Sequence, residues 1–126
     1  HIQWVWRCGG KLLVNPGSCG VALDFRTDAA YAILEWDGTI WQCTLRRVAY
    51  DVNKALAEMQ STPCAKDLLV WHGILAKELE TGREQAIPFL HFAEQYATEM
   101  ADAQRPFTHD TWQAAYAAWL AQNRND

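Results

Sequence analysis

The sequence predicts an α+β fold, in which antiparallel strands and hairpins are followed by about four C-terminal helices. Two glycine-containing turns divide the first half into short segments rich in β-branched and aromatic residues. In the second half, apolar residues recur at positions i, i+3, i+4 and i+7, which is the spacing of an amphipathic helix. We therefore expect a single domain, residues 1–126, with a β-hairpin region over residues 1–50 and a helical C-terminal extension over residues 51–126.

The first predicted hairpin is centred on Gly9-Gly10, a pair that readily adopts the positive φ angles of a two-residue turn. The segment before this turn, Ile2 to Cys8, is rich in Trp and Val, and Lys11 to Val14 returns antiparallel. Asn15 to Gly20 then contains a proline, two glycines and a serine, a cluster that cannot continue a strand. A loop is therefore expected after the first hairpin.

The second predicted hairpin carries the clearer turn signal, Asp37-Gly38. Its arms are Tyr31 to Trp36 and Thr39 to Val48. Apolar and polar residues alternate along the second arm, which indicates that one face is more buried than the other.

Four segments of the second half have helical periodicity. The first, Asp51 to Gln60, begins with a residue that suits an N-cap. The second runs from Ala65 to about Glu80 and is expected to stop at Gly82. The third covers Phe89 to Met100, and Thr108 is expected to cap the fourth. We interpret the aromatic stripe of the fourth helix as core and not as a ligand platform.

Composition argues against several classes of function. The net charge is −4 and the pI is about 5.5, so no basic patch is present to bind a nucleic-acid backbone. No apolar run reaches the ~18 residues of a membrane span. The four cysteines form no C-x-x-C pair, which disfavours a zinc knuckle or a redox motif. Without a secretory signal, we expect reduced thiols in a cytoplasmic protein. We assign the seven tryptophans mainly to the core.

Two groups of polar residues invite a catalytic interpretation but do not support one. Three histidines of the second half show no metal-ligand spacing, because no two of them lie four residues apart: His72, His91 and His109. Three aspartates of the first half lie in loop or turn contexts, where aspartate is expected on structural grounds alone: Asp24, Asp28 and Asp37.

Three sequence segments in the first half together resemble a known protein family. The chain opens with His1-Ile2-Gln3, and Leu12-Leu13-Val14-Asn15-Pro16-Gly17-Ser18 follows. After the Asp37-Gly38 hairpin comes Arg46-Arg47-Val48-Ala49-Tyr50-Asp51. In this order and spacing, residues 1 to about 60 resemble the C-terminal part of a calcineurin-like metallophosphoesterase of the small bacterial and archaeal type. That resemblance implies a hydrolase, specifically a phosphodiesterase or phosphomonoesterase, in which two sheets form a sandwich flanked by helices.

The resemblance also implies a metal site and its position in the chain. Members of this family hydrolyse phosphoesters with two divalent metal ions, such as Mn, Fe, Zn or Ni. His1 matches the last histidine of the family's Gly-His-x-His motif and would be a metal ligand of the complete enzyme. The loop residues Asn15, Gly17 and Ser18 would border the phosphate site, with backbone N–H groups facing an anion. The alternative, a tight turn in which Asn15 satisfies backbone groups, is favoured because Pro16 removes one donor.

This chain departs from the family pattern in its ligand count. A dinuclear site needs on the order of seven or eight protein ligands, and only His1 matches one. Because the first residue is His1 and not methionine, we expect further residues upstream. We therefore predict that the chain alone is inactive and binds no metal specifically. Its expected partner is a missing N-terminal catalytic half or a second copy of itself, and the complete enzyme would bind a small phosphoester. Two alternatives stay open: a non-catalytic protein-interaction or regulatory module, and a small-molecule or nucleotide-binding domain.

Overall fold

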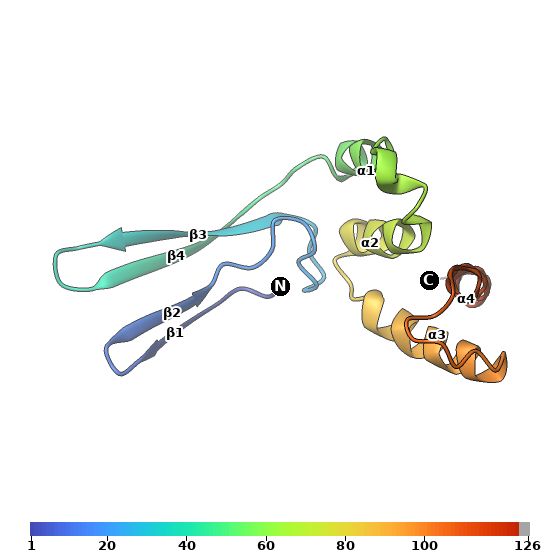
Figure 1. The fold of residues 1–126 in the computed structure, drawn as a ribbon. Coiled ribbons are helices and arrows are strands. Elements are labelled where there is room, and N and C mark those ends of the chain that lie inside the picture. The colour runs from blue at the N-terminus through green and yellow to red at the C-terminus, as the bar shows by residue number, and fades with distance from the viewer. Residues whose placement is uncertain (124–126) are drawn as a thin grey trace.

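The computed structural model describes residues 1–123, and the last three residues of the predicted domain, 124–126, lie outside the described part (Figure 1). Two antiparallel hairpins precede the helices, which confirms the α+β class. The elements, in chain order, are β1 (Trp4–Cys8), β2 (Lys11–Asn15), β3 (Ala29–Trp36), β4 (Trp41–Val48), α1 (Val52–Gln60), a 3₁₀ turn (Pro63–Ala65), α2 (Leu69–Thr81), α3 (Ala86–Glu99) and α4 (His109–Gln122).

The strands form two separate two-stranded sheets, β1–β2 and β3–β4. Each hairpin turns where the sequence predicts. Gly9 and Gly10 both have positive φ angles, +55° and +76°. In the second turn, Asp37 Oδ1 accepts the N–H groups of Thr39 and Ile40, both at 2.9 Å. The longer ladder pairs Ala29 with Val48 at one end and Trp36 with Trp41 at the other.

Most of the predicted helix boundaries are confirmed by their caps. Asp51 Oδ1 accepts the N–H of Lys54 at 2.9 Å, and Thr108 Oγ1 accepts the N–H of Thr111 at 3.2 Å. Gly82 ends α2 in the left-handed conformation, with φ +64°. These side chains and this glycine satisfy backbone groups that a helix end leaves without partners.

The second helix begins later than predicted. The periodicity suggests a start at Ala65, but α2 begins at Leu69. Residues 63–65 form a 3₁₀ turn, and the N–H groups of Asp67 and Leu68 both bond to the carbonyl oxygen of Cys64. That shared acceptor closes a turn where an α-helical ladder would have to continue.

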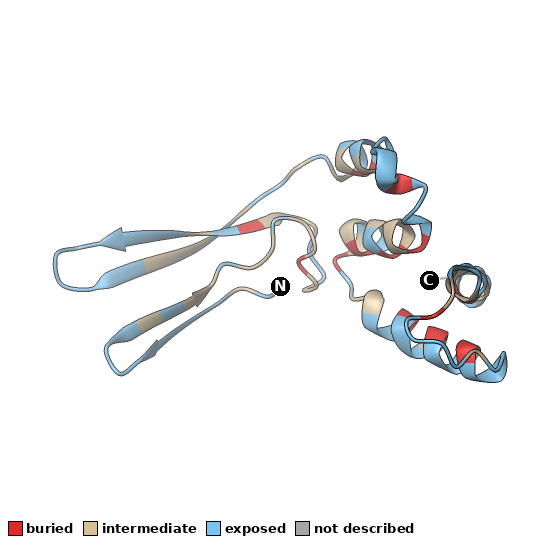
Figure 2. Cartoon of the chain, in the orientation of Figure 1, coloured by how far each residue is buried: buried red, intermediate tan, exposed pale blue. Residues whose placement is uncertain are grey.

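The core lies between α2, α3 and α4 (Figure 2). Phe89 of α3 is fully buried at its centre, and four aromatic rings surround it at centroid distances of 5.8–6.2 Å. Those rings belong to Trp71, Trp112, Tyr116 and Trp119. The predicted core role of the aromatic stripe on α4 is therefore confirmed.

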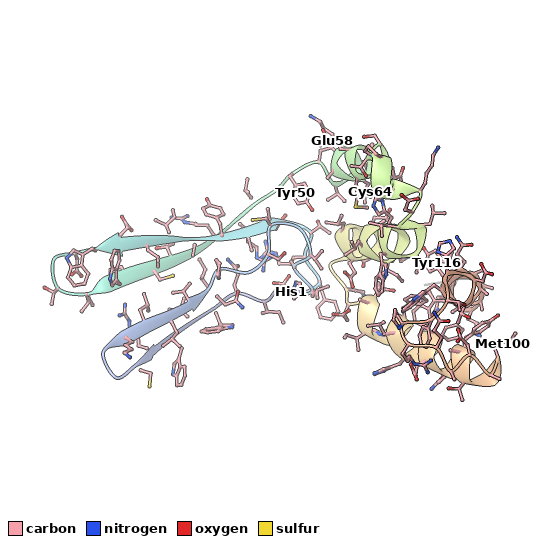
Figure 3. All side chains as sticks on the ribbon, viewed as in Figure 1. His1, Tyr50, Glu58, Cys64, Met100 and Tyr116 are labelled. Atoms are coloured by element: carbon pink, nitrogen blue, oxygen red, sulfur yellow. The ribbon has the colours of Figure 1, made fainter. Side chains whose placement is uncertain are left out.

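The hairpins bury far less, and the prediction that the tryptophans form the core is wrong for the four that lie on the strands. Their four tryptophans are 45–59% exposed: Trp4, Trp6, Trp36 and Trp41. Figure 3 shows the hairpin side chains projecting from both sides of the two ribbons. Two strands have no second layer against which to close a core, so their apolar side chains stay in contact with solvent.

Candidate functional site

His1 lies where the base of the hairpins meets the loop that precedes β3 (Figure 3). Its Nδ1 atom is 2.6 Å from the carbonyl oxygen of Val21. Because a carbonyl oxygen can only accept a hydrogen bond, Nδ1 carries the proton in this contact. The lone pair of the neutral imidazole is therefore on Nε2. An N–H that is anchored on a backbone carbonyl is the usual outer partner of a metal-ligating histidine.

The loop from Asn15 to Ser18 folds directly against the His1 segment. Asn15 Oδ1 accepts the N–H of Gly17 at 2.9 Å, which closes a side-chain turn. A Cβ atom on Gly17 would lie 2.6 Å from Cβ of Ala30, 2.7 Å from Cγ of Gln3 and 3.3 Å from the carbonyl oxygen of His1. Only glycine permits this close approach, and Gly17 also has φ +88°.

The structure thus brings together the site residues that the sequence analysis selected, His1 and the 15–18 loop. It also shows how the loop amides are used. The N–H of Gly17 is donated to Asn15, and Ser18 Oγ accepts the N–H of Gly20 at 3.4 Å. The loop therefore forms the tight turn in which Asn15 satisfies a backbone group. Its role beside a phosphate stays a prediction.

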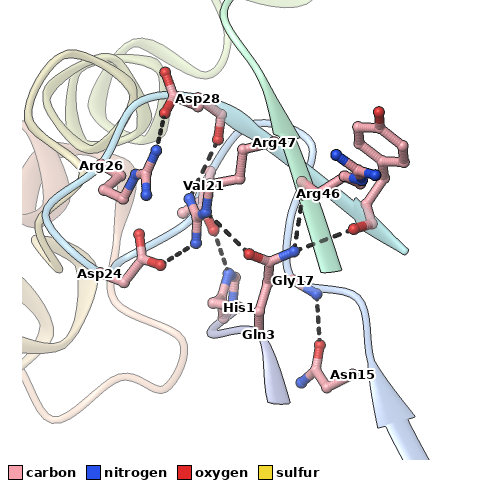
Figure 4. A network of polar contacts seen from close by, with 11 residues as sticks. His1, Gln3, Asn15, Gly17, Val21, Asp24, Arg26, Asp28, Arg46 and Arg47 are labelled. Atoms are coloured by element: carbon pink, nitrogen blue, oxygen red, sulfur yellow. Dashed lines mark hydrogen bonds and ion pairs between the residues drawn. The ribbon is translucent and has the colours of Figure 1, made fainter. Parts of the chain in front are cut away.

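A largely buried guanidinium holds the loop before β3 and the His1 segment to the second hairpin (Figure 4). Arg47 of β4 donates from Nε to Gln3 Oε1 at 3.0 Å, and its Nη2 forms an ion pair with Asp24 Oδ2. The Arg47 and Asp24 side chains are only 12% and 18% exposed. Gln3 Nε2 in turn donates to the carbonyl oxygens of Tyr31 and Arg46, at 3.1 and 3.0 Å.

The same loop also contacts the helical half. The N–H of Phe25 donates to the carbonyl oxygen of Gly82 at 2.9 Å, at the end of α2. A Cβ atom on Gly82 would lie 2.5 Å from the backbone nitrogen of Arg26, so the two backbones touch. Beside this contact the guanidinium of Arg83 lies over the Phe25 ring, 5.3 Å from its centroid. The loop before β3 is thus fixed from both sides.

The sequence analysis did not select Gln3, Asp24 or Arg47 as site residues. One signal for Arg47 was available in the sequence. Residues two apart on a strand share a face, so Arg47 lies on the same face of β4 as Leu45 and Cys43. A charged residue on an otherwise apolar face usually has a buried partner. No comparable signal marks Asp24, since its loop position is an ordinary place for aspartate. Its Oδ1 atom is buried without a hydrogen-bond partner among the described residues.

Within residues 1–123, no three His, Cys, Asp or Glu side chains are grouped so that they could hold a metal ion. His1 fits the role of a single ligand, but in the part of the chain that the structure describes it belongs to no group of three or more such donors. Among the other histidines, His109 contacts Gln113 Nε2 at 2.8 Å, and Nδ1 of His72 is buried without a partner in the described residues. Neither lies in a metal-ligating group.

A cavity of about 690 Å³ opens elsewhere, in the helical half. Lys77, Arg83, Gln85 and Trp119 are among its lining residues, whereas neither His1 nor the 15–18 loop contributes to it. This cavity and the His1 region are therefore separate features.

Comparison with known proteins assigns no relative. No family model matches the chain, and neither a curated protein nor a solved structure is similar to it. None of the helices in the described residues is both long and apolar enough to cross a membrane.

Proposed function

We propose that this chain is the C-terminal portion of a metal-dependent phosphoesterase and that His1 is one of its metal ligands. The observation that carries the proposal is the hydrogen bond between His1 Nδ1 and the carbonyl oxygen of Val21 at 2.6 Å. It selects the tautomer whose Nε2 atom can bind a metal, and it limits rotation of the ring.

The surroundings of His1 support the same proposal. The 15–18 loop packs against the backbone of His1, and the ion pair between Arg47 and Asp24 fixes the loop that contains Val21. In the complete enzyme, two divalent ions would hold the attacking hydroxide and the phosphate oxygens. This chain would contribute the orientation of one imidazole and one wall of the site, and the remaining ligands would come from outside it.

The exposed hairpins favour a second candidate, a protein-interaction module. Large apolar side chains on β1, β2, β3 and β4 are 38–59% exposed, and contiguous apolar surface of this kind marks an interface. In the phosphoesterase proposal this surface is covered by the catalytic half of the same enzyme. In the module proposal it is covered by an unrelated protein. The coding DNA distinguishes the two: a phosphoesterase predicts Gly-His-x directly before His1 and a D-x-H motif about 100 to 160 residues earlier.

The direct experiment uses the polypeptide encoded by the whole gene. We expect His1→Ala to lower phosphodiesterase activity by about 100-fold or more and to reduce the bound metal from two ions toward one per chain, because a ligand is lost outright. The matched control is His91→Ala, an exposed histidine of α3, which should change neither quantity. Equal metal content and activity in the His1→Ala protein would refute the assignment.

A second experiment uses residues 1–126 alone. With bis-p-nitrophenyl phosphate and added Mn²⁺, hydrolysis should not exceed a metal-only blank, because one histidine cannot hold a dinuclear centre. Activity above the blank would show that the chain contains a complete site of its own, which the arrangement of ligands proposed here does not allow.

A further inference from the structure

The cavity of about 690 Å³ in the helical half is a feature that the proposed function leaves unused. It lies where the end of α2, the start of α3 and the end of α4 come together. Its volume falls within the roughly 300–1,000 Å³ that is usual for small-molecule sites. Such sites hold a ligand through a few convergent polar groups and an apolar or aromatic wall. The lining of this cavity supplies both.

Two cationic side chains line the cavity, and neither is paired with a carboxylate in the described residues. The charged residues among those that line it are Lys77, Arg83 and Glu84. Lys77 and Arg83 form no ion pair within residues 1–123, although Glu80 follows Lys77 by three residues on the same helix. Glu84 is engaged elsewhere, since its Oε1 atom accepts the N–H of Ile87 at 3.0 Å. The cavity therefore presents two cations, a charge that suits an oxyanion.

The backbone at the start of α3 is already satisfied and cannot bind that anion. The N–H groups of Gln85 and Ala86 both donate to Oε1 of Glu78 at 2.9 Å, and Glu78 is only 3% exposed. Pro88, in the first turn of α3, has no N–H to donate. An anion in the cavity must therefore be bound by side chains.

Trp119 of α4 supplies the aromatic wall. Its partly buried ring packs edge-on against Phe89 and Phe92, at centroid distances of 6.0 and 5.4 Å. The carbonyl oxygen of Trp119 accepts the N–H of Asn123 at 3.1 Å and its Nδ2 at 2.8 Å, which closes the end of α4 beside the cavity. The indole is thus held by the core on one side and lines the cavity on another. A ligand ring would meet a fixed aromatic partner there.

We infer that this cavity binds a small aromatic oxyanion, with a phosphate-like group held by Lys77 and Arg83 and a ring against Trp119. Two cations match the nearly two negative charges of a phosphoryl group better than the single charge of a carboxylate. A polyanion is disfavoured, because the chain carries a net charge of −4. The cavity is separate from His1, so the inference does not depend on the phosphoesterase proposal.

The first test titrates the chain with phenylphosphonate, in which a C–P bond replaces the ester that a phosphoesterase would hydrolyse. Methylphosphonate keeps the charge without the ring, and benzyl alcohol keeps the ring without the charge. By nuclear magnetic resonance, the indole N–H signal of Trp119 should shift, and phenylphosphonate should bind about tenfold more tightly than either fragment. Equal affinity for methylphosphonate would mean an adventitious ion only and would overturn the inference. Absence of binding, or shifts at the exposed hairpin tryptophans in place of Trp119, would overturn it as well.

A matched pair of lysine substitutions tests the charge. Lys77→Gln removes a cation from the cavity, and Lys66→Gln removes one from an exposed position that does not line it. Lys77→Gln should raise the dissociation constant of phenylphosphonate about tenfold, because a charge-assisted hydrogen bond is lost, and Lys66→Gln should leave it unchanged. Lys77 is a better test than Arg83, whose guanidinium also contacts the Phe25 ring.

Both lysines are exposed, so neither substitution should disturb the fold, and circular dichroism checks this. Because the two substitutions change the net charge equally, the comparison separates a local contact from general attraction. Equal dissociation constants for the two variants would leave only general attraction and would overturn the inference.

Discussion

The two halves of this molecule contain similar kinds of residues but use them differently. Each has large aromatic side chains, yet the helical half encloses Phe89 completely while the hairpin half leaves Trp6 59% exposed. Three helices can surround a side chain from several directions, whereas a single two-stranded ribbon offers one face at a time. The difference is therefore one of architecture: the helical half closes a core around Phe89, and the hairpin half leaves its large apolar side chains exposed.

The contact between the halves includes a close approach of two backbone segments. On the helical side it involves Gly82 and Arg83, and on the hairpin side the loop before β3, which the Arg47 guanidinium fixes. His1 depends on this loop through Val21. The polar contacts between distant segments of the hairpin half are therefore gathered around His1, while its large apolar side chains stay exposed.

The largest effect is expected in the helical core. Phe89→Ala should lower the free energy of unfolding by about 3 to 5 kcal/mol, because it leaves a cavity among four aromatic rings that have no room to close in. Chemical denaturation followed by near-ultraviolet circular dichroism measures this. The matched control is Trp6→Ala in the hairpin half, which should cost about 0.5 kcal/mol or less. If the two substitutions cost the same, the contrast between a closed and an open half is wrong.

The next effect is expected at the largely buried ion pair between Arg47 and Asp24. Arg47→Met should destabilise the chain by about 1 to 3 kcal/mol, because Asp24 and Gln3 lose their partner while remaining largely enclosed. Arg46→Met is the control, since that side chain is exposed and only its backbone oxygen takes part in the network. Arg47→Met should also weaken the hydrogen bond between His1 and Val21, because the loop that contains Val21 is no longer fixed. This would appear as a change in the imidazole ¹⁵N chemical shifts of His1. Unaltered shifts would show that Val21 holds the ring without this network.

How much of this organisation the sequence predicts depends on the range over which each signal acts. The Gly9-Gly10 and Asp37-Gly38 turns and the Asp51 and Thr108 caps act within three or four residues, and all of them are confirmed. Contacts between distant segments leave weaker marks. Nothing local connects Arg47 with Asp24, 23 residues away, and nothing in the periodicity distinguishes a hairpin tryptophan from a core tryptophan.

The candidate site shows the same limit. Its position follows from the resemblance that placed His1 and the Asn15–Ser18 loop in one site, and the structure brings those two segments into contact. The hydrogen bond to Val21 that orients His1 was not predicted, because a backbone carbonyl carries no side-chain signature. Periodicity also failed at Ala65, where a turn closed by Cys64 precedes the helix.

A smaller effect is expected where the halves touch. Gly82→Ala should cost about 1 to 2 kcal/mol for its left-handed conformation, plus the cost of moving the Arg26 backbone away from the new Cβ atom. Gly9→Ala isolates the first contribution, because Gly9 also has a positive φ, +55°, but nothing lies within 4 Å of its Cβ position. Gly82→Ala should therefore be the more destabilising of the two and should speed exchange of the Phe25 amide. Equal costs, with the Phe25 amide unchanged, would mean that the halves do not depend on this contact.

The smallest effect concerns acid stability inside the helical half. The pKa of Asp102 is held below its ordinary value, first by a hydrogen bond from Thr111 Oγ1 at 2.7 Å and then by the N–H of Gln104 at 2.9 Å. Because the pKa is lower in the folded state, this carboxylate stabilises the fold above the unfolded pKa of about 4, and the contribution is lost as pH falls through the folded value.

Asp102→Asn should therefore lower the melting temperature at pH 7, and the difference from the unsubstituted protein should shrink steadily below about pH 4. Asp110→Asn is the control, an exposed aspartate in the first turn of α4, where the helix dipole alone predicts a weaker effect. Thermal unfolding of the three proteins between pH 3 and 7 measures both differences. If the difference in melting temperature between Asp102→Asn and the unsubstituted protein does not change with pH, the effect of the asparagine comes from its shape. The charge of Asp102 would then not stabilise the start of α4.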